Sequence, residues 1–125
     1  MLIQTLNNTS FLGFSNLFLI THNSANKLCK MKKETFIRSL NSDMPLDEAS
    51  PALQALWYDA QNDWDGAHKI AQEIQTSVGS AIHAYLHRKE GDNSNASYWY
   101  LNAGTTLPNV SFEEEWLLLV EKLTE

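Results

Sequence analysis

The sequence predicts an all-α protein, with about five helices arranged as antiparallel hairpins and packed into a compact bundle. From Pro45 onward, apolar residues recur at the i, i+3, i+4, i+7 spacing of an amphipathic helix. Residue types that cap helix N-termini precede these segments, and glycines follow several of them. The strict alternation of apolar and polar residues that is typical of half-buried β-strands is missing.

The first predicted hairpin begins at Ser50, an N-cap residue followed by proline at the first helical position. The apolar stripe of its first helix consists of Leu53, Leu56, Trp57, Ala60 and Trp64. Asp63 can cap the second helix, whose stripe consists of Ala67, Ile70, Ala71, Ile74 and Val78. The segment "TSVGS", residues 76–80, contains a glycine that we expect to break the helical pattern.

The second predicted hairpin starts with a helix over residues 80–90, which ends at Gly91. Either Asp92 or Ser94 caps a fourth helix, which runs to Ala103. The fifth helix begins with a capping box formed by Ser111 and Glu114. We expect its inward face to consist of Phe112, Trp116, Leu119, Val120 and Leu123. Leu117 and Leu118 then point outward, where an association surface or the N-terminal segment could cover them.

A shift of 29 residues aligns "LQALWYDAQNDWDGA" with "IHAYLHRKEGDNSNA", so that Asp63 meets Asp92 and Ala67 meets Ala96. "NASYWYLNAG" resembles the turn and second helix of tetratricopeptide or Sel1-like units, and the resemblance covers about residues 53–108. The offset is shorter than the 34 residues usual for that family, and Asn62 stands where the first unit should have glycine. The phrase "HAYLHRKEGD…NA.YWY..AG" also resembles a family of small uncharacterised bacterial and fungal proteins. The tetratricopeptide resemblance implies helical hairpins and peptide or protein binding rather than catalysis.

Residues 1–30 differ from the rest, because they are rich in Asn, Ser and Thr and contain no acidic residue. Their apolar run, Phe11–Ile20, is too short to span a bilayer. It is compatible with a signal peptide or an amphipathic docking segment. A poorly structured N-terminal extension is the favoured interpretation, since Met31 resembles a natural start. The predicted organisation is therefore this extension followed by a single helical domain, residues 31–125.

The charge of the chain argues against nucleic-acid binding. The net charge is −6, and residues 31–125 alone hold 7 basic against 15 acidic side chains, without a clustered basic patch. Cys29 is the only cysteine, so an intramolecular disulfide is impossible, and a reducing, cytoplasmic location is expected. No membrane span and no cofactor are predicted from the sequence.

The candidate site lies on the third predicted helix, where His83, His87 and Glu90 share one strip at the spacing i, i+4, i+7. Two imidazoles and a carboxylate in this arrangement can hold a metal ion or act as acid and base on a ligand. Any further metal ligand would have to come from elsewhere, and the possible residues are His68, Asp65, Asp92 and Asn95. The competing structural interpretation is that the histidines form hydrogen bonds across the hairpin while Glu90 pairs with Arg88 or Lys89.

The aromatic residues of the "YWY" segment divide between core and site. Tyr98, next to Asn95, is the first candidate for an aromatic side chain that faces a ligand. Trp99, Trp57 and Trp64 are expected in the core. The candidate ligand-binding residues are thus His83, His87, Glu90, Asn95 and Tyr98.

The sequence contains no phosphate loop, nucleotide fingerprint, nucleophile elbow or paired catalytic carboxylates, and we assign no catalytic residue. It favours a small non-catalytic protein that binds a protein or peptide partner or forms a homodimer. The alternative is a small-molecule-binding protein or a metal-assisted enzyme that uses His83, His87 and Glu90.

Overall fold

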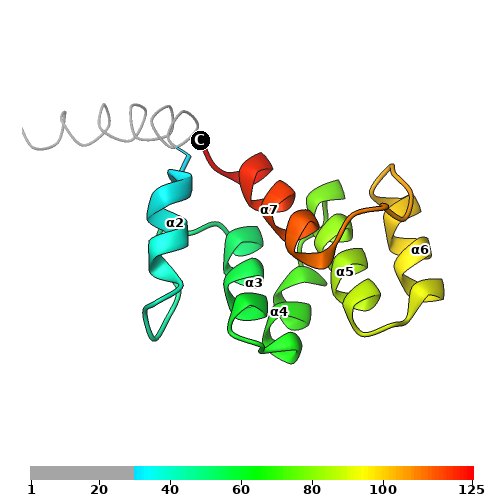
Figure 1. The fold of residues 1–125 in the computed structure, drawn as a ribbon, viewed down its shortest axis with the longest axis horizontal. Coiled ribbons are helices and arrows are strands. Elements are labelled where there is room, and N and C mark those ends of the chain that lie inside the picture. Colours follow the sequence, from blue (N-terminus) through cyan, green and yellow to red (C-terminus); the bar gives the residue numbers. More distant parts are fainter. Residues whose placement is uncertain (1–29) are drawn as a thin grey trace, which may run out of the picture. The chain divides into compact units, whose positions relative to one another are not determined.

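The computed structural model describes residues 30–125, and this part of the chain is all-α, as the sequence predicts. It contains one helix more than the roughly five expected, and no strand occurs between residues 30 and 125. The helices are α2 (Lys33–Ser39), α3 (Pro51–Ala60), α4 (Trp64–Ala71), α5 (Ser77–Lys89), α6 (Asn93–Asn102) and α7 (Phe112–Leu123) (Figure 1). The expectations for residues 1–29, including the run Phe11–Ile20, lie outside the described residues.

The additional helix is α2, which is held by tertiary contacts rather than by a cap. No side chain caps its N-terminus, and seven residues are too few to form a stable helix alone. Phe36 is buried in the main core, and the Trp57 indole on α3 donates a hydrogen bond to the Ser39 carbonyl at 2.9 Å. The Glu125 amide at the other end of the chain donates to the carbonyl of Met31 at 3.0 Å. These contacts explain why local patterns did not reveal α2.

The turns between α3 and α4 and between α5 and α6 have the same local structure. Asn62 and Gly91, which are 29 positions apart, both have positive φ, 66° and 92°. The amides of the next residues, Asp63 and Asp92, donate back to carbonyls in the preceding helix at 2.9 Å. Both aspartate side chains then accept hydrogen bonds from backbone amides in the following helix, at 2.9 and 3.1 Å. Asp92, rather than Ser94, is therefore the cap of α6, and Asn62 takes the left-handed conformation that its glycine counterpart takes more easily.

The boundary between α4 and α5 differs from the prediction. The pattern suggested one helix through Val78 and a break at Gly79, but α4 ends at Ala71 and α5 begins at Ser77. Gly79 lies inside the first turns of α5, where an added Cβ would lie 2.0 Å from the Ile74 carbonyl oxygen. The glycine therefore permits a close approach between α5 and the preceding loop, and it does not break a helix.

The core is built around small residues at the helix crossings. Ala55, Ala67, Ala84 and Ala96 are all fully buried, so the paired backbones of α3 with α4 and of α5 with α6 approach closely. The main core consists of residues from α2, α3, α4, α5 and α7, with Leu53, Leu56, Ile82 and Leu86 among its largest fully buried side chains. A smaller cluster of Ala84, Ala96 and Tyr100 joins α5 to α6.

Helix α7 partly follows the prediction for its inward face. Val120 is buried, and Trp116, Leu119 and Leu123 are half-buried against the core, while Leu117 and Leu118 are exposed as expected. Phe112 is 38% exposed, because it lies at the start of the helix with the Arg88 guanidinium 4.7 Å from its ring centroid. Among residues 30–125, no helix is long and apolar enough to cross a membrane.

Candidate functional site

Three histidines from two helices meet between α4 and α5. His83 and His87 lie one turn apart on α5, and His68 projects from α4. The Nε2 atoms of His68 and His83 are 2.8 Å apart, and the rings of His83 and His87 stack at 4.9 Å. One nitrogen from each of the three rings lies within 4.8 Å of the others. His68, which the sequence offered only as one of several optional contributors, is therefore a full member of this histidine cluster (His68, His83 and His87).

Two tryptophans pack against the histidine cluster, each on a different ring. The Trp64 ring stacks on His68 with centroids 4.6 Å apart, and the Trp99 ring stacks on His83 at 4.1 Å. The Trp64 indole donates to the Leu86 carbonyl at 2.9 Å, which fixes the position of that ring. As a result His83 and His87 are only 6% and 7% exposed. Trp64 and Trp99, expected as core residues, are half-buried and form the walls of the cluster.

Burial lowers the pKa of two of these histidines, His68 and His83. The pKa of His83 is lowered to about 4, mainly by desolvation and in addition by the neighbouring His68 and His87. Desolvation followed by repulsion from His87 also lowers the pKa of His68. The contact between the two Nε2 atoms needs one protonated and one unprotonated nitrogen. Near neutral pH the cluster therefore offers at least one imidazole lone pair at its centre.

Glu90 belongs to the site through His87. Its carboxylate Oε2 accepts a hydrogen bond from His87 Nδ1 at 2.7 Å, which places the remaining lone pair of a neutral His87 on Nε2. The Asn95 side-chain nitrogen lies 3.4 Å from that Nε2. His87 therefore contacts the three other candidates His83, Glu90 and Asn95, and Glu90 contacts this histidine rather than the centre of the cluster.

The expected pairing of Glu90 with Arg88 or Lys89 is wrong. Arg88 Nη1 donates to Glu115 on α7 at 2.7 Å, and Lys89 Nζ donates to Asp59 on α3 at 2.8 Å. Both basic side chains point across helix interfaces, because the helical rotation from Glu90 carries them to other faces of α5. Pairing over short sequence separations could not anticipate these partners.

Tyr98 does not join the histidine cluster. It is 61% exposed, and its ring packs edge-on against Trp99 with centroids 5.2 Å apart. Tyr100 is instead the buried member of the "YWY" segment, and its hydroxyl donates to Glu115 at 2.6 Å. The signal that could have identified His68 is its i, i+4 spacing from Trp64, since aromatic pairs at this spacing share one helix face.

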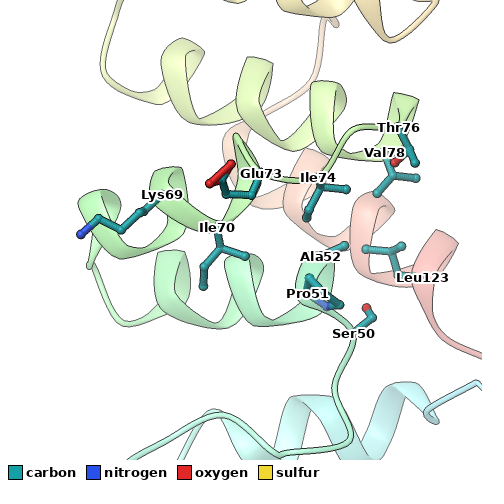
Figure 2. A pocket seen from close by; sticks show the side chains of 10 residues that line it. All are labelled: Ser50, Pro51, Ala52, Lys69, Ile70, Glu73, Ile74, Thr76, Val78 and Leu123. Atoms are coloured by element: carbon teal, nitrogen blue, oxygen red, sulfur yellow. The ribbon is translucent and has the colours of Figure 1, made fainter.

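Of the surface grooves on residues 30–125, four are well formed, and none of these four is lined by a member of the histidine cluster. The largest of the four, about 650 Å³, is here called the apolar groove (Figure 2). Its apolar lining comes from Pro51 and Ala52 of α3, Ile70 of α4, the following Ile74, Val78 of α5 and Leu123 of α7. Its polar lining residues are Ser50, Lys69, Glu73 and Thr76.

Comparisons of the chain with protein-family models, curated proteins and solved structures found no match. The resemblance to tetratricopeptide units stays a prediction.

Proposed function

We propose that this protein is a non-catalytic binding protein that accepts an apolar segment of a peptide or protein partner in the apolar groove. The observation that carries the proposal is the lining of this groove. Ile70, Ile74, Val78 and Leu123 are all half-buried and face one opening. Apolar side chains that stay partly hydrated gain free energy when a partner covers them, at roughly 25 cal/mol per Å² of apolar area.

The rim of the groove suggests how a partner would be oriented. Lys69 lies on α4, and Glu73 follows two residues after the end of that helix. Both side chains are exposed at the edge of the groove near Ile70 (Figure 2). A groove with an apolar floor and a few charged groups at its edge resembles those in which peptide helices place anchors at i, i+3 and i+4. Its volume of about 650 Å³ has room for a few such anchors.

The experiment is a selection of peptides from a random display library on the immobilised full chain, followed by titration calorimetry. We expect the selected peptides to share apolar anchors and to bind Ile70→Lys at least tenfold more weakly than the natural chain. Leu101→Lys is the matched control, because it adds the same charge at an exposed apolar position on α6. Circular dichroism checks that both variants are folded.

A second measurement does not depend on any variant. Backbone amide NMR shifts on adding a selected peptide should cluster on α4, the start of α5 and the end of α7. Shifts that cluster elsewhere, or equal affinity for Ile70→Lys and Leu101→Lys, would refute the groove as the binding site.

Self-association through α7 is the second candidate. Leu117 and Leu118 are 43% and 54% exposed, and Glu113, Glu114 and Glu121 are exposed on the same helix. Two copies of this surface would repel one another electrostatically, so any dimer should strengthen with added salt. Sedimentation of the natural chain and of Leu117→Ser/Leu118→Ser at low and high salt tests this. A monomer under all conditions would dismiss it.

A further inference from the structure

We propose that His68, His83 and His87 form a binding site for a zinc-class divalent metal ion, with Glu90 holding His87 in the orientation for coordination. The site is separate from the apolar groove, so it goes beyond the proposed function. The inference depends on three features of the histidine cluster: the distances, the hydrogen bond to Glu90 and the type of ligand atom.

The distances require only small side-chain movements. Zinc–nitrogen bonds of about 2.0–2.1 Å place the ligand atoms of a tetrahedral site roughly 3.3 Å apart. The Nε2 atoms of His68 and His83 are 2.8 Å apart, and all three rings offer a nitrogen within 4.8 Å. An ion would therefore move the close pair apart by a few tenths of an ångström and draw the third nitrogen inward. We expect rotation of the three side chains, which come from α4 and α5, to be enough for this.

The Glu90 contact is the arrangement that commonly accompanies metal-bound histidine. Such histidines donate their second ring nitrogen to a carboxylate or carbonyl, which fixes the tautomer and increases the basicity of the ligand nitrogen. Glu90 Oε2 accepts from His87 Nδ1 at 2.7 Å, leaving Nε2 for the ion. Asn95, 3.4 Å from that Nε2, is placed to offer its amide oxygen after a rotation, or to leave the fourth position to water.

The choice of metal follows from the ligand type. Three imidazole ligands favour zinc, copper, nickel or cobalt, whereas magnesium and calcium prefer oxygen ligands. His87, Glu90 and Asp92 also have ligand atoms within 4.8 Å of one another. That set is the weaker candidate, because Asp92 caps α6 and Glu90 is already bonded to His87.

The test uses the full chain after removal of metal by a chelator. Cobalt(II) added to the natural chain should give the visible absorption of a four-coordinate site, saturating at one ion per chain and displaced by zinc. We expect a zinc Kd of about 1 µM or tighter at pH 7.5 by calorimetry, and no saturable binding of magnesium or calcium.

Three variants separate this site from adventitious binding. His68→Gln, at the half-buried position, should weaken zinc at least tenfold, and Glu90→Gln should weaken it by about 10- to 100-fold. His22→Gln, the remaining histidine of the chain, is the matched control and should bind as the natural chain does. Circular dichroism verifies that each variant is folded.

The proposal is overturned if the folded natural chain shows no saturable cobalt or zinc binding. It is equally overturned if His68→Gln binds as well as the natural chain, or if His22→Gln removes the binding. Peptide binding at the apolar groove is measured separately, so failure of one proposal leaves the other to its own test.

Discussion

Glu115 is the residue whose removal should destabilise the fold most clearly without leaving a large cavity. It lies on α7, is 7% exposed, and its two carboxylate oxygens accept from Arg88 Nη1 at 2.7 Å and from the Tyr100 hydroxyl at 2.6 Å. The Arg88 guanidinium also donates to the Val110 carbonyl. Burial, and next the hydrogen bond to Glu115, raise the pKa of Tyr100, so its hydroxyl stays protonated as a donor. One carboxylate thereby joins α7 to both α5 and α6.

The magnitude follows from what Glu115→Ala leaves behind. Removing one partner of a buried ion pair costs about 3–5 kcal/mol, because the other charge remains buried without compensation. The Arg88 side chain is 14% exposed and keeps its bond to Val110, so we expect the lower end, about 3 kcal/mol. Tyr100→Phe removes only the donor to the same carboxylate and should cost about 1.5–3 kcal/mol.

The assay is urea unfolding followed by circular dichroism at pH 7. The control is Glu121→Ala, the same substitution on the same helix, at an exposed residue whose carboxylate lies 2.9 Å from Lys33 Nζ. We expect the control to change the free energy of unfolding very little. The double variant Arg88→Met/Glu115→Leu should recover most of the stability lost in Glu115→Ala, because no buried charge is left alone.

Equal stability of Glu115→Ala and Glu121→Ala would refute this reasoning. It would mean that the Arg88 guanidinium finds water once Glu115 is gone, and that the buried network contributes little to holding α7.

Three further predictions concern acid stability and two backbone positions. The pKa of His83 falls from 6.5 in the unfolded chain to about 4 in the fold. Metal-free protein should therefore keep its full stability above pH 6.5 and lose up to about 3 kcal/mol as the pH falls to 4. Urea midpoints that stay constant between pH 7 and 4.5 would contradict this. Asn62→Gly should stabilise by about 0.5–1 kcal/mol, since Asn62 has a φ of 66°, whereas Gln61→Gly, at a φ of −89°, should not; thermal unfolding of the pair decides. Gly79→Ala should destabilise the fold by about 2 kcal/mol despite the better helix propensity of alanine, because the new Cβ would lie 2.0 Å from the Ile74 carbonyl oxygen. An unchanged or higher melting temperature would show that the loop containing Ile74 moves to make room for the methyl group.

Interactions between residues close together in the chain were sufficient to predict the all-α class and most of the helix ends. Ser50, Asp63 and Ser111 accept hydrogen bonds from backbone amides in the first turn of the helices that they precede, as their positions predict. The shared turn at Asn62 and Gly91 was also visible, because a cap and a left-handed residue act on backbone groups a few positions away. These interactions depend on residues that are neighbours in the chain, so the sequence by itself determined them.

Only the tertiary structure decided which side chains meet across helices. His68 contacts His83 across 15 residues of sequence, and Arg88 pairs with Glu115 across 27 residues instead of with Glu90, two positions away. Both partnerships depend on how far α4 and α7 are rotated and shifted against α5, and that arrangement is set by the close packing of the whole core, which no pattern along the chain specifies. A strip of two histidines and a glutamate was therefore recognisable in the sequence, whereas a three-histidine cluster packed against two tryptophans exists only once the helices are packed.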